Sequence, residues 1–376
     1  MRILLSFIFS SILLLGLPAA GIFLSGQPVE QYMEFPPLTR YVRHAGPSWL
    51  VFAVLFVSIS AFLYPFLKRF LEASPGHGSL GQDQRSFPWW GKGALFICVI
   101  SWVLAWTRFS WFRPFQPYTF IPLWFSFVFL VNGLSHWRTG SSLLERAPVG
   151  FVLLFPASSI FWWYFEYLNR FVQNWYYVGI DDFSTIQYVV TASVSFSTVL
   201  PAVLSVNEFL KGFGRFENAF EDFAPLNLRT PGIVAACALL LSSSGLIAIG
   251  ILPDILFPLL WTAPLIIVTA INFFLGIPTV FEPLGKGSWT PVCRLAASGL
   301  ICGIFWEMWN YFSYAKWIYS IPFVSQLKIF EMPLLGYAGY LPFGLECAVA
   351  GSFVMGLQDI LESRAPLMVR KCSPKA

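Results

Sequence analysis

Long apolar runs divide this chain into about ten segments, each bounded by charged residues or by proline and glycine. Each run is roughly 20 residues long, the length that an α-helix needs to cross the hydrocarbon core of a bilayer. The runs are continuously apolar, so they predict helices and not the alternating strands of a membrane β-barrel. Inside lipid a helix also satisfies its own backbone hydrogen bonds. The expected helices cover residues 3–25, 48–67, 93–108, 119–136, 148–166, 187–207, 231–251, 255–277, 291–309 and 338–358.

The fold class that this pattern predicts is all-α, a polytopic membrane helix bundle. Composition agrees, because 57% of the residues are hydrophobic and only 11% are charged, whereas soluble proteins have about a quarter charged residues. The net charge of +4 is too mild to indicate nucleic acid as a partner. The first run begins behind Arg2 and is longer than the apolar core of a signal peptide. We therefore expect an uncleaved first helix, although Ala19 and Ala20 also suit a cleavage site.

Basic residues are distributed unequally between alternate loops. With the N-terminus inside, 16 of the 23 Lys and Arg residues lie in inner segments and 7 in outer segments. Because positively charged loops resist translocation, this bias sets the orientation. We expect both termini in the cytoplasm, and an inner-membrane location in a bacterium.

Two stretches of the chain resemble each other, FWWYFEYLNRFVQNWYY at 161–177 and GIFWEMWNYFSYAKWIY at 303–319. Six positions agree in order at an offset of 141 or 142. They pair Glu166 with Glu307, Asn169 with Asn310, Trp175 with Trp317, Tyr177 with Tyr319, Pro122-Leu123 with Pro264-Leu265, and Pro201 with Pro342. This predicts two parallel internal repeats of four helices, related by an axis along the membrane normal because each repeat has an even number of spans.

The domain layout follows from these repeats. Two leading helices and a cytoplasmic loop occupy 1–92, repeat one 93–207, a polar cytoplasmic linker 208–230, repeat two 231–358, and a cytoplasmic tail 359–376.

Each repeat carries a Glu and an Asn three residues apart, a spacing that stacks them on one helical face. A carboxylate at membrane depth is costly and usually faces a cavity or a partner. Glu166, Asn169, Glu307 and Asn310 are therefore candidate site residues. The alternatives are that Glu166 pairs with Arg170 one turn later, and that the Trp-x-Tyr pairs are interface anchors.

Repeat two holds more acidic residues than repeat one. Glu331 precedes Pro333, and Glu346 lies about two turns into the tenth helix, where repeat one has Ser205. This asymmetry predicts that repeat two holds the reactive or binding groups. The glycines Gly336, Gly339 and Gly344 predict close approach of helices or of a flat ligand.

The residues Trp306-Glu307, Trp317-x-Tyr319 and Pro342 to Glu346 resemble the membrane lycopene cyclase domain of carotenoid synthesis. That family has tandem membrane repeats with an acidic residue after Trp, an aromatic pair, and then a Pro-x-Glu-Glu stretch. This chain departs from it in having Glu for the usual Asp, one shifted glutamate for the pair, and four helices for about three. The likeness covers about a third of the chain.

The resemblance implies redox-neutral cyclisation or isomerisation of a polyene. A carboxylic acid would protonate a double bond, and aromatic faces would stabilise the carbocation. Glu307, Glu346 and Glu331 are the implied acids. The implied aromatic wall comprises Trp306, Trp309, Tyr311 and Tyr337, and Trp317 and Tyr319 are further candidate binding residues.

Two other functions stay open. One is a transporter or lipid-handling protein in which the repeats move about Glu166 and Glu307, and the other is a non-catalytic membrane subunit. The six cysteines and three histidines form no metal-binding or haem pattern, and no Walker loop, dinucleotide fingerprint or serine elbow is present. We therefore expect no metal and no cofactor, and a membrane lipid or isoprenoid as the ligand; protein partners are not predicted.

Overall fold

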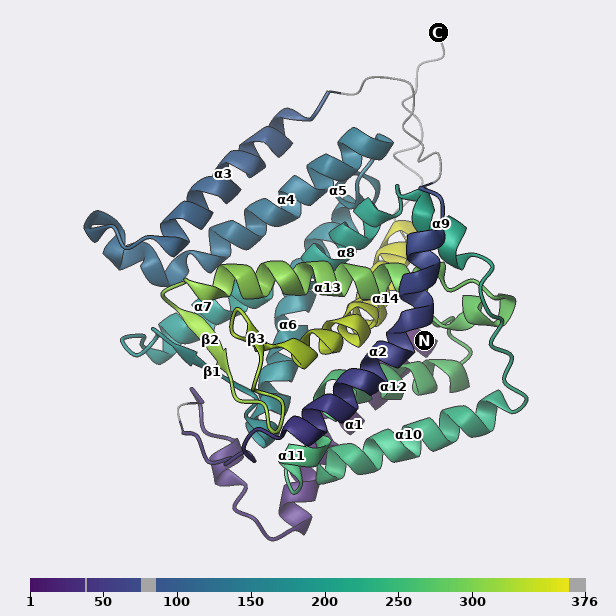
Figure 1. The fold of residues 1–376 in the computed structure, drawn as a ribbon, viewed down its shortest axis with the longest axis horizontal. Helices are drawn as coiled ribbons and strands as arrows, with labels where there is room; N and C mark the ends of the chain where they lie inside the picture. Colours follow the sequence, from purple (N-terminus) through teal and green to yellow (C-terminus); the bar gives the residue numbers. More distant parts are fainter. Residues whose placement is uncertain (38, 76–85, 365–376) are drawn as a thin grey trace.

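The computed structural model describes residues 1–37, 39–75 and 86–364 of the chain (Figure 1). Within these residues the fold is helical, which confirms the expected all-α class. The helices are α1 (Arg2–Leu24), α2 (Trp49–Glu72), α3 (Trp89–Trp106), α4 (Phe120–Thr139), α5 (Leu143–Arg146), α6 (Pro148–Val172), α7 (Thr185–Phe196), α8 (Val199–Leu210), α9 (Gly214–Phe220), α10 (Pro231–Ala248), α11 (Pro253–Leu256), α12 (Leu259–Phe274), α13 (Thr290–Tyr311) and α14 (Tyr340–Arg364). Four short strands are β1 (Trp175–Val178), β2 (Lys316–Tyr319), β3 (Lys328–Ile329) and β4 (Met332–Pro333).

Nine helical segments of the described residues are long and apolar enough to cross a membrane, with α7 and α8 counted together. α12 is a shorter apolar helix, because Pro258 lies just before it and the expected helix 255–277 is divided into α11 and α12. α6 extends six residues beyond the expected end at 166. The predicted inner residues Arg85, Arg370, Lys371 and Lys375 and most of the predicted tail lie outside the described residues.

The expected single helix 187–207 is interrupted at Ser197 and Thr198. Pro201 has no N–H group, so the carbonyl four residues earlier has no helical donor. Ser158 of α6 occupies the break: its hydroxyl donates to the Phe196 carbonyl (2.6 Å) and accepts from the Leu200 N–H (3.0 Å). A break of this kind is tolerated at membrane depth where protein surrounds it.

α8 lies at the centre of the bundle and packs against α4, α6, α13 and α14. α14 in turn packs against α6, α12 and α13. α3 lies beside α4, and α10 lies beside α12, on opposite sides of this centre (Figure 1). α1 packs on α10 and α12. Among the described residues, the main contacts of α2 are with α9 and with the 3₁₀ segment Leu334–Gly339.

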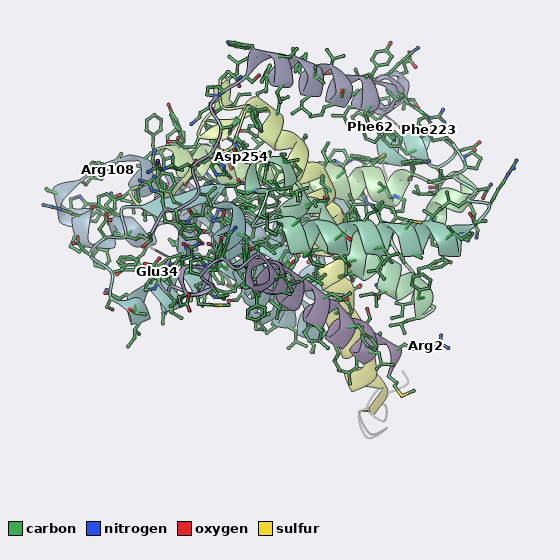
Figure 2. All side chains as sticks on the ribbon, turned by 90° about the horizontal axis from the view of Figure 1, so that it is seen from below. Arg2, Glu34, Phe62, Arg108, Phe223 and Asp254 are labelled. Carbon is green, nitrogen blue, oxygen red and sulfur yellow. The ribbon has the colours of Figure 1, made fainter. Side chains whose placement is uncertain are left out.

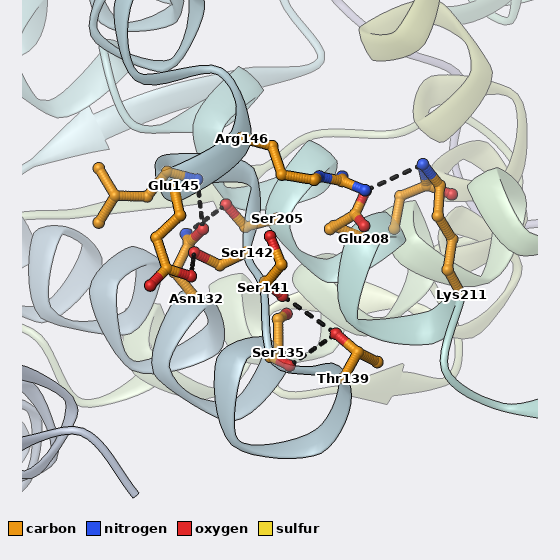
Figure 3. A network of polar contacts seen from close by, with 12 residues as sticks. Asn132, Ser135, Thr139, Ser141, Ser142, Glu145, Arg146, Ser205, Glu208 and Lys211 are labelled. Carbon is orange, nitrogen blue, oxygen red and sulfur yellow. Dashed lines mark hydrogen bonds and ion pairs between the residues drawn. The ribbon is translucent and has the colours of Figure 1, made fainter. Parts of the chain in front are cut away.

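Polar side chains link α4, α5 and α8 near one end of the bundle (Figure 3). Asn132 donates to the Ser205 hydroxyl (2.8 Å) and accepts from the Leu144 N–H (3.0 Å). Glu208 forms ion pairs with Arg146 (2.5 Å) and Lys211 (2.9 Å). These contacts satisfy the buried polar groups of α8 inside the protein, as a bundle in lipid requires.

Loop segments from distant parts of the chain gather at the other end of the bundle. His44 Nδ1 lies 2.6 Å from Asp254 Oδ1, and the Ser320 N–H donates to the Asn174 carbonyl (2.7 Å). The Gln173 side chain accepts from the N–H groups of Tyr41 and Val42, both at 2.8 Å. The segments between α1 and α2, between α6 and α7, between α10 and α12, and after α13 therefore share one end.

α13 and α14 cross at very short range through glycines. A Cβ atom on Gly344 would lie 2.0 Å from the Leu295 carbonyl oxygen, and one on Gly299 would lie 2.2 Å from the Tyr340 carbonyl oxygen. Small residues that let backbones approach are the usual device of helix packing in lipid. Gly344 thus serves helix approach, as the sequence predicted for it.

Replacing Gly344 by alanine should push α13 and α14 apart and destabilise the protein by about 1–3 kcal/mol. The matched control is Gly339→Ala, because a Cβ atom there meets only Trp261 at 3.9 Å. The melting temperature of the purified protein in detergent should fall for G344A and stay close to wild type for G339A. Equal melting temperatures for the two variants would contradict this description of the crossing.

Candidate functional site

The two Glu-x-x-Asn motifs are held by the same local hydrogen bonds. Asn169 Nδ2 donates to the Trp175 carbonyl (2.8 Å), and Asn310 Nδ2 donates to the Trp317 carbonyl (2.8 Å). The Asn310 side-chain oxygen accepts from the Trp317 N–H at 2.9 Å, and the Asn169 oxygen lies 3.4 Å from the Trp175 N–H. In each motif the asparagine fixes the strand that follows its own helix. The asparagines are therefore positioning residues.

The two strands that follow the motifs pair with each other. β1 and β2 are antiparallel, with Trp175 opposite Tyr319 and Tyr177 opposite Trp317. The sequence match makes Trp175 the counterpart of Trp317 and Tyr177 the counterpart of Tyr319. If each residue is replaced by its counterpart, the pair Trp175–Tyr319 becomes the pair Trp317–Tyr177, which is also present in the register. A register that maps onto itself is what a two-fold axis between two equivalent strands gives.

Glu166 is 5% exposed and has three donors on one oxygen. Its Oε1 accepts from Trp162 Nε1 (3.1 Å), Trp175 Nε1 (3.1 Å) and the Tyr177 hydroxyl (2.5 Å). Arg170 turns away to the Gln31 carbonyl and to Glu34. The alternative pairing of Glu166 with Arg170 is thus not an ion pair in the structure.

Glu307 is fully buried and has two donors on one oxygen. Its Oε1 accepts from the hydroxyls of Tyr340 (2.6 Å) and Tyr319 (2.8 Å), and Trp317 Nε1 donates to Tyr319 (3.0 Å). Its Oε2 has no hydrogen-bond partner among the described residues. Burial, followed by the nearby Glu307 carboxyl group, holds the pKa of Tyr319 well above its ordinary value. Tyr319 therefore stays protonated and acts as a donor to Glu307.

A cavity of about 130 Å³ lies between the two motifs. Twelve of the twenty residues in its wall are aromatic, and the wall includes residues of α4, α6, α7, α12, α13, α14 and both paired strands. The side chains in this wall that also donate to Glu166 or Glu307 are Trp162, Trp175, Tyr177, Tyr319 and Tyr340. The two carboxyl groups are therefore each one hydrogen bond behind the surface of the same cavity.

The Trp-x-Tyr pairs are part of this cavity wall. Trp175 is 4% exposed and packs against Trp162 and Trp261. Trp317 packs edge-on against Phe120, which also lines the cavity. These indoles face the protein interior, whereas an interface anchor would face the headgroup region.

Of the other predicted acids, Glu331 forms an ion pair with Lys316 at 2.5 Å. Lys316 itself lines the cavity, whereas Glu331 is not in its wall. The pair closes over one side of the cavity and neutralises the lysine there.

Glu346 lies in α14, is 3% exposed, and is not among the residues that line the aromatic cavity. Neither of its carboxyl oxygens has a hydrogen-bond partner among the described residues. The buried Tyr164 hydroxyl of α6 also has none, and it lies within electrostatic reach of Glu346. Ser205, which the sequence paired with Glu346, is by contrast bonded to Asn132.

The predicted aromatic wall is only partly assembled at the cavity. Trp306, Trp317 and Tyr319 line it. Trp309 is 1% exposed and packs against Trp102 and Trp124, away from the cavity. Tyr311 is the last residue of α13 and is 37% exposed.

Tyr337 lines a different, larger groove beside α2, and its ring contacts Tyr340. Its hydroxyl donates to the Ile329 carbonyl (3.0 Å). Tyr337 therefore stands between the groove and the cavity, and only Tyr340 of this pair reaches Glu307.

Sequence reasoning missed Tyr340 and Trp162. At the offset of 141 the counterpart of Trp162 is Gly303, and a Cβ atom on Gly303 would meet the Tyr340 ring at 2.3 Å. Tyr340 thus fills in one half the space that an indole fills in the other, and it supplies the missing donor. The only signal in the sequence is the glycine one turn before Glu307.

No group of three or more His, Cys, Asp and Glu side chains that could hold a metal ion occurs among the described residues. Comparison of the chain with protein-family models, curated proteins and solved structures finds no match. The apolar helices and the aromatic clusters define the class: the chain is an integral membrane protein.

Methionine substitutions at Glu166 and Glu346 should change stability in opposite directions. Glu166→Met leaves three buried donors unsatisfied, each at a cost of about 1–3 kcal/mol, whereas Glu346→Met removes a buried carboxyl group that has no partner. The melting temperature in detergent should fall strongly for E166M and stay level or rise for E346M. A large fall for E346M would show that Glu346 has a bonded partner and would contradict the geometry described.

Proposed function

We propose that this protein is an integral membrane enzyme that isomerises or cyclises an unsaturated isoprenoid or lipid by proton transfer. The observation that carries the proposal is the position of Glu307. It is a fully buried carboxyl group; one oxygen accepts from two tyrosines of the cavity wall, and the other has no hydrogen-bond partner in the described part of the chain. An unpaired charge at this depth is costly, so the neutral, protonated acid is favoured.

The chemistry begins with the double bond of the substrate taking a proton. The proton comes from the neutral carboxyl group of Glu307 by way of Tyr319 or Tyr340. That tyrosine turns its hydroxyl from Glu307 to the substrate, gives its proton to the double bond and takes the proton of Glu307 in exchange. One carbon of the double bond gains a C–H bond, and the other becomes a carbocation. The indole faces of the wall attract this cation by about 0.5–2 kcal/mol each. Attack by a second double bond closes a ring, or the cation stays open.

The reaction ends when a neighbouring carbon loses a proton and the electron pair of its C–H bond forms a new double bond. The proton returns to the ionised carboxyl group of Glu307, either directly or through the tyrosine. Substrate and product are isomers, and no oxidant or reductant is consumed.

The size of the cavity limits what enters it. Its 130 Å³ is close to the roughly 150 Å³ of an apolar protein cavity that holds benzene. It therefore suits a ring-sized end of a substrate, with the rest of a long hydrocarbon outside.

Glu307→Gln should abolish the reaction, because glutamine has no acidic proton; general acid catalysis is worth about 10²–10⁴-fold in rate. Tyr340→Phe should slow it, and Glu72→Gln, an exposed glutamate of α2, should leave it unchanged. Lipid and pigment extracts of cells expressing each variant, analysed by chromatography and mass spectrometry, measure the product. In D₂O the product should carry deuterium, and a product without deuterium, or full activity in E307Q, would refute proton transfer from Glu307.

A transporter or lipid-handling protein is the second candidate, and the break between α7 and α8 favours it, because broken helices line the substrate sites of many transporters. Such a protein should depend equally on Glu166 and Glu307. The enzyme should depend far more on Glu307, since Glu166 has three donors on one oxygen and serves to hold the wall. Unchanged extracts together with equal loss of transport in E166Q and E307Q would support the transporter.

We further propose that the two halves are parallel repeats. Three features support this: the matching asparagine bonds, the symmetric β1–β2 register, and the contacts among helices. The helix contacts correspond pair by pair. The contact of α3 with α4 corresponds to that of α10 with α12, and the contact of α4 with α8 corresponds to that of α12 with α14. The contact of α8 with α13 corresponds to that of α14 with α6.

The orientation we propose puts both termini in the cytoplasm of a bacterial cell and the β1–β2 pair outside. Single cysteines at Asp182, before α7, and at Asn227, in the linker, test it in a background lacking the native cysteines. An impermeant maleimide should label D182C in intact cells and N227C only after permeabilisation. The reverse pattern would invert the orientation without altering the bundle.

A further inference from the structure

α2 is hydrogen-bonded to the rest of the protein at its two ends and is separated from the bundle between them. At its start the Ser48 N–H donates to the Phe323 carbonyl (2.8 Å), and near its end Arg69 donates to the carbonyls of Ala219 and Asp222. Of its residues only Phe52 is buried. Figure 2 shows α2 apart from the other helices, with Phe62 and Phe223 at the space between.

The space under α2 is a groove of about 1170 Å³. Its α2 wall runs from Phe56 to Phe70, about 21 Å at the helical rise, and its opposite wall is formed mainly by α13 and the 3₁₀ segment Leu334–Gly339. The volume exceeds the ordinary range of small-molecule pockets, about 300–1,000 Å³. Nearly all of its lining residues are apolar, so the groove suits hydrocarbon chains.

One end of the groove carries a cation. Arg215 of α9 lines the groove with its guanidinium carbon 5.6 Å from the centre of the Phe70 ring. Its Nε is buried without a hydrogen-bond partner, and no described carboxylate lies within ion-pair distance of it. The neighbouring Arg294 is instead paired with Glu217. The opposite end, at Leu334 and Leu335, is apolar.

We propose that this groove binds an anionic phospholipid, with its acyl chains along α2 and its phosphate at Arg215. The apolar length fits the chains, and the unpaired guanidinium fits an anionic oxygen. Basic pockets between membrane helices are the usual sites of anionic headgroups. The proposal does not depend on the reaction proposed above, because Arg215 lies at the far end of the groove from Tyr337 and Tyr340.

The test is native mass spectrometry of the full-length protein in detergent, supplied with phosphatidylglycerol or phosphatidylcholine. Wild type should retain phosphatidylglycerol preferentially. Arg215→Gln should lower that retention about fivefold or more, given roughly 1 kcal/mol per basic residue. The charge-matched control Arg229→Gln, in the exposed linker outside the groove, should behave as wild type.

A second pair of variants tests the apolar part. Leu63→Trp fills the groove and should displace the lipid, whereas Leu71→Trp, on the same helix but outside the groove, should not. Equal retention of the two lipids by wild type, or equal behaviour of R215Q and R229Q, would overturn the proposal. So would stabilisation by inorganic phosphate alone with no lipid retained, since that marks a phosphate site and not a lipid site.

Discussion

The constraint on which this structure depends is that polar groups in lipid have to find their partners within the protein. One oxygen of Glu166 meets this requirement through two indoles and a phenol. The broken helix meets it through Ser158, which bonds both sides of the break. These local solutions determine where α6, α7 and α8 lie, and their placement in turn builds the aromatic cavity.

The three buried glutamates differ in the number of hydrogen-bond donors they have, and this difference affects their acidity. Within residues 1–37, 39–75 and 86–364, Glu166 has three donors, Glu307 has two donors on one oxygen and none on the other, and Glu346 has no donor. Donors stabilise the charged carboxylate, so fewer donors favour the protonated form. An acid needs both a proton to give and a route to the substrate. For the proposed reaction Glu307 meets both needs, because its tyrosine donors line the cavity, whereas no cavity-lining side chain among the described residues is bonded to Glu346.

The sequence predicted those structural features that depend on residues close together along the chain. Apolar runs predicted helical structure at ten places, although the expected helices 187–207 and 255–277 are each divided in the structure. The Glu-x-x-Asn and Trp-x-Tyr spacings predicted residues that the fold brings to one cavity or directly behind its wall. The sequence did not predict features that depend on a contact with another helix. The break at Ser197 depends on a serine of α6, and the Tyr340 bond to Glu307 depends on space left by Gly303. Neither relation has a spacing that can be read along the chain.

The 3₁₀ segment Leu334–Gly339 connects the groove to the cavity physically. It lines the groove through Leu334, Leu335 and Tyr337, and it leads directly into Tyr340 at the start of α14. The Tyr337 and Tyr340 ring centres lie 6.1 Å apart. A lipid bound as proposed would rest on the segment that leads into Tyr340, one of the donors of Glu307. Because packed interiors transmit strain, we expect occupancy of the groove to affect the hydrogen bonding of the acid through this segment.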